Sequence, residues 1–267
     1  MKKYLSFFRL RFLCGLQYRV AALAGIVTQF FWGGMEILIF RAFFKTSPQD
    51  FPMSFEATAS YIWLQQGFLA LFAAWMVEGE IFDSIMNGNI AYELCRPISI
   101  YHMWFSRSVA HRLSRAVLRC FPIFIFAALL PSPYGLCKPA SALHFFLFLC
   151  TLLLGLLVTV AFCVLIYALT FFTISPMGLR MVFVSMVEFF AGAVIPLPFF
   201  PTKLQRIMEL LPFGSMQNVP LRIYSGNITG SEIWKVVLLQ MLWFLILAIL
   251  GNALCRIAEK KVCVQGG

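Results

Sequence analysis

Six apolar segments, each close to the length of a membrane-spanning helix, constrain the fold of this chain more than any other feature. Such a helix needs about 20 mostly apolar residues. The segments run approximately over residues 21–44, 57–78, 108–130, 142–170, 180–200 and 232–254. In the hydrocarbon core every backbone amide has to be hydrogen-bonded within the protein, which a helix achieves by itself. We therefore predict an all-α integral membrane protein with six transmembrane helices.

The composition favours a single transmembrane domain over residues 1–267. Hydrophobic residues make up 61% of the chain and charged residues 12%, about half the charged fraction of a soluble domain. A net charge of +10 would suggest nucleic acid in a soluble protein, but basic residues that flank membrane spans set the topology instead. No basic module interleaved with aromatic residues is visible, so no nucleic-acid partner is expected.

The distribution of lysine and arginine predicts the orientation of the chain. With six crossings, 14 of the 21 lysines and arginines fall on the side of the two termini. An excess of these residues marks the cytoplasmic side of a membrane. Both termini and residues 80–107 are therefore expected in the cytoplasm, and residues 196–231 outside.

Residues 80–97 form the longest polar interruption of the apolar sequence. Four apolar residues recur there at every fourth position, which favours one apolar stripe along a helix. They are Phe82, Met86, Ile90 and Leu94. The polar residues off this stripe are Glu80, Asp83, Asn87 and Glu93. We predict a cytoplasmic amphipathic helix, the coupling segment, whose polar side is free for a soluble partner.

The N-terminal residues 1–19 predict a second amphipathic helix. Leu5, Phe8, Phe12 and Leu16 follow helical spacing, and Arg9 lies away from them. Apolar burial and anionic lipid would hold such a helix on the inner leaflet.

The end of the fifth apolar segment carries three prolines in the run GAVIPLPFFP. Each proline removes a backbone donor and disfavours a continuing helix, so we expect a proline-broken fifth span. Thr202 and Gln205 match a capping box at the start of a short external helix. Residues 196–231 are then a re-entrant segment, or an ordinary external loop with an interfacial helix.

Two carboxylates fall inside apolar segments, Glu36 in the first and Glu188 in the fifth. An ionisable group in the hydrocarbon usually faces a bundle interior or a cavity, so these residues are candidates for a substrate path. The alternatives are a structural pair, such as Glu36 with Arg41, or a carboxyl group kept protonated by its apolar surroundings.

Motifs of self-contained chemistry are missing from the sequence. There is no GxxxxGK(S/T), HExxH or GxSxG, and the three histidines are isolated. We expect no catalytic residue, no metal site and no cofactor in this chain. A secondary transporter or channel that works alone is the main alternative from another class, and Glu36 and Glu188 are its candidate coupling groups.

Several stretches resemble the permease subunits of type-two ABC exporters. They are SIMNGNIAYELCRPIS (residues 84–99), AGAVIPLPFFP, LLPF and PLRIYSGNITG. The similar proteins form a bacterial subgroup often encoded with a second permease and a separate ATPase, and the resemblance covers nearly the whole chain.

The resemblance implies a division of labour. Two permeases, identical or homologous, would form the pore in the bacterial cytoplasmic (inner) membrane, and two P-loop ATPase subunits holding ATP and Mg would dock below. The implied ATPase-coupling residues are Glu80, Asp83, Asn87, Gly88, Glu93, Arg96 and Pro97. The implied external gate consists of Ile195, Pro196, Leu197, Pro198, Phe199 and Phe200.

Overall fold

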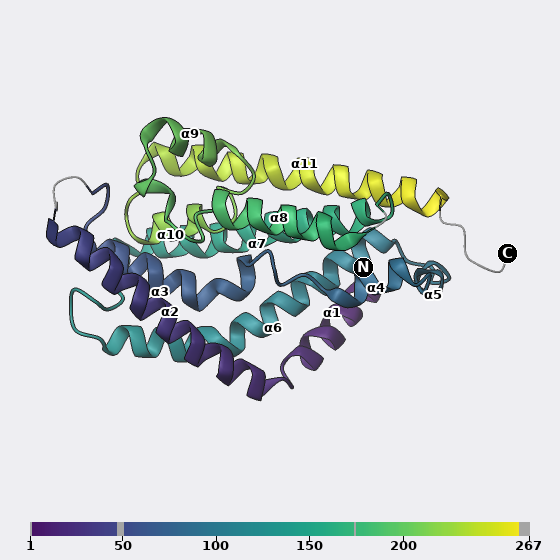
Figure 1. The fold of residues 1–267 in the computed structure, drawn as a ribbon, viewed down its shortest axis with the longest axis horizontal. Coiled ribbons are helices and arrows are strands. Elements are labelled where there is room, and N and C mark those ends of the chain that lie inside the picture. The colour runs from purple at the N-terminus through teal and green to yellow at the C-terminus, as the bar shows by residue number, and fades with distance from the viewer. Residues whose placement is uncertain (1, 47–50, 174, 262–267) are drawn as a thin grey trace.

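The computed structural model describes residues 2–46, 51–173 and 175–261. Within these residues the secondary structure consists of eleven α-helices and one 3-10 helix, without a strand (Figure 1). The all-α prediction is confirmed. Three helices are long and apolar enough to cross a membrane: α2 (Arg19–Thr46), α7 (Ala142–Thr170) and α11 (Ser231–Lys261).

The other three predicted spans correspond to helices with different bounds. These are α3 (Phe55–Phe72), α6 (Ile100–Leu129) and α8 (Pro176–Phe190). Helix α3 ends six residues before the predicted 78, and α6 begins eight residues before the predicted 108. Helix α8 has 15 residues, about 22 Å, so it is shorter than the hydrocarbon core of about 30 Å. The arrangement of all six as spans therefore stays a prediction.

The connections between the long helices gather at two ends of the bundle. Figure 1 shows the N-terminal helix α1 (Lys2–Gly15), α4 (Gly79–Met86), α5 (Ile90–Leu94) and the last turns of α11 at one end. Helices α9 (Thr202–Leu210) and α10 (Asn218–Tyr224) lie at the other end.

Helix α7 is the centre of the core and packs against α11, α10, α6, α3 and α8. Gly155 allows a close approach of the backbone at Met216, because a Cβ there would stand 2.2 Å from the Met216 carbonyl oxygen. Helix α2 packs against α3 and α6 through a second apolar cluster that includes Ile37, Trp63 and Ile123. The outward faces of α2 and α11 expose large apolar side chains, as lipid-facing helices do.

Helix α1 packs along α6 and has no fully buried residue. The hydroxyl of Tyr4 accepts a hydrogen bond from the amide of Ser99 at 3.1 Å, and Ser106 Oγ donates to the Tyr4 carbonyl at 3.2 Å. Helix α1 corresponds to the helix predicted over residues 1–19 and ends at Gly15. One side of it packs against α6.

The break after α8 comes from a glycine rather than from the prolines. Gly192 has a φ of 74° and donates to Phe189 O, while Ala193 N–H donates to Glu188 O. These two bonds make a Schellman motif, which ends a helix at a glycine in the left-handed conformation. The prediction that Pro196 and its neighbours break the span is wrong in this respect, since the helix ends before they begin.

The predicted capping box is also wrong. Pro201 occupies the N-cap position of α9 with an extended backbone, so Thr202 is already inside the helix. Gln205 Nε2 donates to Glu209 at 2.8 Å instead of capping the helix. Helix α9 buries only Met208, whereas α10 buries six of its seven residues.

Gly155→Ala tests the close packing at the core. We expect a loss of about 1–3 kcal/mol of stability, because the added methyl group overlaps the Met216 carbonyl. Gly178→Ala in α8 is the matched control, because no atom lies within 4 Å of its Cβ position. The readout is the thermal unfolding midpoint of the purified protein in detergent; equal midpoints for the two variants would contradict the packing described here.

Candidate functional site: the coupling segment and its anchor

The coupling segment consists of two short helices instead of one. Helix α4 ends at Met86, Gly88 adopts a φ of 73°, and α5 begins at Ile90. The Asn87 amide donates to Asp83 O at 2.9 Å, which closes the last turn of α4. The prediction of a single helix within the coupling segment is wrong, because the left-handed residue Gly88 separates α4 from α5.

The predicted apolar stripe is divided by the same break. Phe82 and Ile90 are buried, but Met86 is 46% exposed and Leu94 is half-buried. Tyr92 is 75% exposed, although tyrosine usually buries much of its ring. Most of the predicted coupling residues are on the surface of this segment. The exposed ones are Glu80, Asp83, Asn87, Gly88, Arg96 and Pro97.

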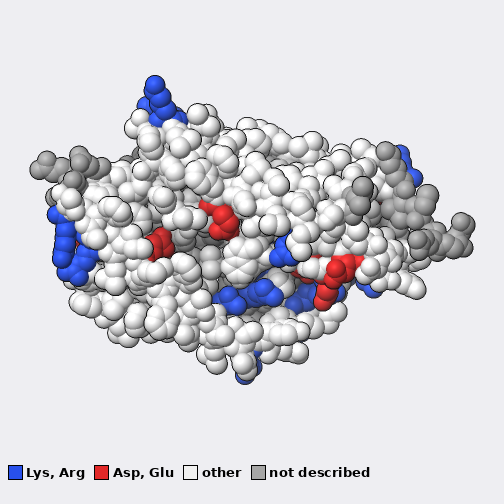
Figure 2. Space-filling model, viewed as in Figure 1, with Lys and Arg blue, Asp and Glu red and all other residues white. Residues whose placement is uncertain are grey.

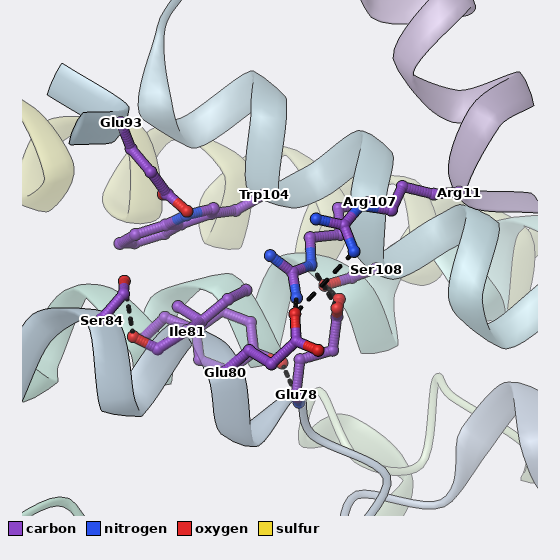
Figure 3. A network of polar contacts seen from close by, with 10 residues as sticks. Arg11, Glu78, Glu80, Ile81, Ser84, Glu93, Trp104, Arg107 and Ser108 are labelled. Atoms are coloured by element: carbon purple, nitrogen blue, oxygen red, sulfur yellow. Dashed lines mark hydrogen bonds and ion pairs between the residues drawn. The ribbon is translucent and has the colours of Figure 1, made fainter. Parts of the chain in front are cut away.

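Glu93 differs from the other coupling residues, because it faces the protein. Its Oε2 accepts a hydrogen bond from Nε1 of the fully buried Trp104 at 2.8 Å (Figure 3). Glu93 therefore ties α5 to α6.

An ion-pair cluster ties α4 to the membrane helices. Arg107 of α6 donates from Nε to Glu78 and from Nη2 to Glu80, and Ser108 Oγ donates to Glu78 at 3.2 Å (Figure 3). The side chains of Glu78 and Arg107 are 8% and 7% exposed, whereas that of Glu80 is 74% exposed. Arg11 of α1 approaches Glu80 at 3.8 Å. We name Glu78, Glu80, Arg107 and Ser108 the anchor.

The link between α3 and α4 is held by a second arginine. Arg112 is 1% exposed, and its Nη1 donates to Leu71 O and Ala73 O at 3.0 Å each. These carbonyls lie at the C-terminal, negative end of the α3 dipole, where a cation is stabilised. The amide of Glu78 then donates to the hydroxyl of Tyr167 in α7 at 2.9 Å. The coupling segment is thus bonded to α6 and α7, and through the Arg112 clamp to the end of α3.

The two carboxylates in the apolar helices have different surroundings. Glu36 is half-buried and accepts from Gln66 Nε2 at 3.4 Å. Arg41 lies over the ring of Tyr134 at 4.9 Å, so the suggested Glu36–Arg41 pair does not form. Glu188 is half-buried, and its side chain has no hydrogen bond or ion pair within the described residues. Figure 2 shows two acidic patches near the middle of a largely uncharged face.

The predicted external gate is mostly packed inward. Pro196, Leu197 and Pro198 are buried, and Leu197–Phe199 forms the 3-10 helix η2. The ring of Phe199 lies 4.8 Å from that of Phe40, which joins this segment to α2. Phe200 packs against Phe189, and Ile195 is exposed. The gate role stays a prediction.

A family profile described as ABC-2 family transporter protein matches residues 30–266. The chain belongs to the ABC-2 transporter family. It is therefore a membrane subunit of an ABC transporter, a permease that is not itself catalytic. A search among curated proteins finds no match. The family match covers all of α3 to α11 and leaves out α1 and the first turns of α2.

The sequence patterns considered above assign the arginines of α6 only to the topology of the permease and do not identify them as anchoring residues. The signal was present, since Arg107, His111, Arg115 and Arg119 recur at every fourth position. That spacing places them along one face of a helix. A basic row inside a membrane helix has to find acceptors, so it predicts a polar interface.

Glu78→Gln tests the anchor of the permease. Removing the Glu78 charge from its buried pair with Arg107 should lower the free energy of unfolding by about 2 kcal/mol or more. Glu80→Gln removes the other carboxylate that pairs with Arg107. Because Glu80 is exposed, its loss should lower the free energy of unfolding by at most about 1 kcal/mol. Thermal unfolding in detergent gives both values. An equal or larger effect of Glu80→Gln would show that the buried pair is not the dominant contact.

Proposed function

We propose that this permease is the pore-forming subunit of an ATP-driven exporter, and that a separate P-loop ATPase docks on α4 and α5. The observation that carries the proposal is the combination of an exposed polar segment with a buried anchor. A segment that only connects two spans needs no exposed tyrosine. It also needs no bonds to α1, α6 and α7 such as those described above.

The exposed side of the coupling segment has the composition of a docking surface. Tyr92 and Arg96 are of the residue types that contribute most to protein interfaces, and Asp83 and Asn87 supply polar contacts beside them. Met86 adds an adaptable apolar side chain to the same segment.

The anchor explains how docking would act on the pore. ATP binding and hydrolysis change how the ATPase subunits contact the permease, and only such a difference can shift its conformational equilibrium. A displacement of α4 has to carry α6 along or break the Glu78–Arg107 pair, and breaking a buried pair costs about 3–5 kcal/mol. Movement of α6 is therefore the lower-energy response. Trp104 and Glu93 transmit the motion of α5 to the same helix.

A second permease, identical or homologous, would cover the face formed by α2 and α8. Helix α8 exposes large apolar residues on the side away from α7, and Glu188 has no partner among the described residues. The exposed large apolar residues of α8 are Met177, Met181, Val182, Met186 and Phe189. Because an unpaired carboxylate in a membrane usually faces a cavity, we place the substrate path between the two permeases, beside Glu36 and Glu188.

The remaining parts of the proposal follow from this arrangement. Six crossings would put both termini, α4 and α5 on one side of the membrane, and the excess of lysine and arginine on that side favours the cytoplasm. The resemblance to bacterial exporters favours the inner membrane. Residues Ile195–Phe200 lie at the opposite end and form the external gate. Two ATPase subunits serve the two permeases and supply the ATP and Mg sites.

Affinity purification from native membranes tests the proposal. The tagged permease should recover a P-loop ATPase, and Asp83→Lys should lower that recovery at least about tenfold because it reverses a charge on the docking surface. Glu232→Lys reverses an equally exposed charge in the first turn of α11 and should leave the recovery unchanged. A chain recovered alone that transports substrate in liposomes without ATP would instead establish a secondary transporter or channel.

A further inference from the structure

A cavity of about 480 Å³ lies where α1, α6 and the α3–α4 link meet. Its polar lining comes from Arg11 and Tyr18 at the α1 end, from Glu78 and Glu80, and from Arg107, His111 and Arg115 of α6. The anchor forms one wall of this cavity, so anything bound there touches the base of the coupling segment.

The positive charge in the cavity is not fully neutralised. Arg107 uses both carboxylates, Glu78 and Glu80, and Arg11 reaches Glu80 only at 3.8 Å. Arg115 is half-buried and has neither a hydrogen bond nor an ion pair in the part of the chain that the structure describes. A guanidinium that is partly withdrawn from water and has no acceptor in the protein is destabilising.

The next turn of α6 carries a second cation of this kind. Arg119 has a buried Nε without a partner. A Cβ at Gly25 of α2 would stand 2.6 Å from the Arg119 Cζ, so the glycine leaves room for the guanidinium between the two helices. Two successive guanidinium groups without acceptors thus lie on the same face of α6.

These observations indicate an anion that the residues described by the structure do not supply. Guanidinium groups bind phosphate oxygens in pairs and with directed hydrogen bonds. We propose that the cavity binds a phosphate group, held by Arg115 and Arg11 beside the hydroxyl of Tyr18. The group could be carried by an anionic phospholipid or by a soluble phosphate, which share this chemistry.

The surroundings of the cavity fit a lipid headgroup in particular. Tyr18 and Trp75 line the cavity and are 73% and 43% exposed, and such aromatic residues are frequent at the headgroup level of membranes. The adjoining turns of α2 expose Val20, Leu23 and Val27, an apolar surface on which acyl chains can lie. Basic pockets between helices at the cytoplasmic side are a known form of headgroup site.

A bound phosphate would bridge α1 and α6 next to the anchor. It would neutralise Arg115 and keep α1 in place against α6, and it would thereby stiffen the element that we propose transmits motion from the ATPase. The binding itself does not depend on the proposed function, so it can be measured on the permease alone.

The test is ligand binding to the purified permease and its variants. Native mass spectrometry compares retention of phosphatidylglycerol with phosphatidylcholine, and equilibrium dialysis measures inorganic phosphate. We expect preferential retention of phosphatidylglycerol, weakened about tenfold or more by Arg115→Gln, which removes a charged hydrogen-bonding partner. Arg206→Gln is the matched control, because Arg206 is exposed on α9 and outside the cavity.

Further measurements distinguish a lipid-borne phosphate from a soluble phosphate, and further variants cover the case in which Arg115→Gln does not fold. Inorganic phosphate binding that Arg115→Gln abolishes, with both lipids retained equally, would assign the site to a soluble phosphate. Arg11→Gln should weaken binding in the same assay, and Arg115→Lys should retain part of it, if Arg115→Gln fails to fold. Lipid and phosphate binding that is the same in wild type, Arg206→Gln, Arg115→Gln and Arg11→Gln would overturn the proposal.

Discussion

The neutralisation of the arginines of α6 is the constraint on which the rest of this permease depends. Arg107 and Arg112 are almost fully buried, and a buried guanidinium needs acceptors. Arg112 donates hydrogen bonds to two carbonyls at the end of α3, and Arg107 donates hydrogen bonds to Glu78 and Glu80. Helix α3 therefore stops at Phe72, and α4 starts where its first acidic residues can reach α6.

The same constraint gives the coupling segment its mechanical character. The anchor, the Glu93–Trp104 bond and the Tyr167 contact connect two short surface helices to α6 and α7. Surface segments with few such bonds move independently of the core. Here several partly buried bonds, including the ion pair of Glu78 with Arg107, hold the segment to the core, which is what a segment that transmits force requires.

The apolar patterns predicted the class and the approximate helices, but not the features that depend on contacts between distant residues. The ends of α7 agree with the prediction because its whole length is apolar. The end of α3 could not be read locally, since it depends on Arg112, 40 positions later. The breaks at Gly88 and Gly192 require a left-handed backbone, and the sequence shows only that a glycine permits it. For Glu93 the spacing indicated a solvent-facing side chain, whereas the buried Trp104 attracts it inward.

The most direct test of the account is photo-crosslinking from the coupling segment in native membranes. A photoreactive aromatic residue would replace Tyr92, which is 75% exposed, or, as a control, Trp234, which is 62% exposed near the start of α11. The account predicts a crosslink from position 92 to a P-loop ATPase, identified by mass spectrometry, and none from position 234. Membranes in which the permease transports its substrate while position 92 crosslinks to no ATPase would contradict it.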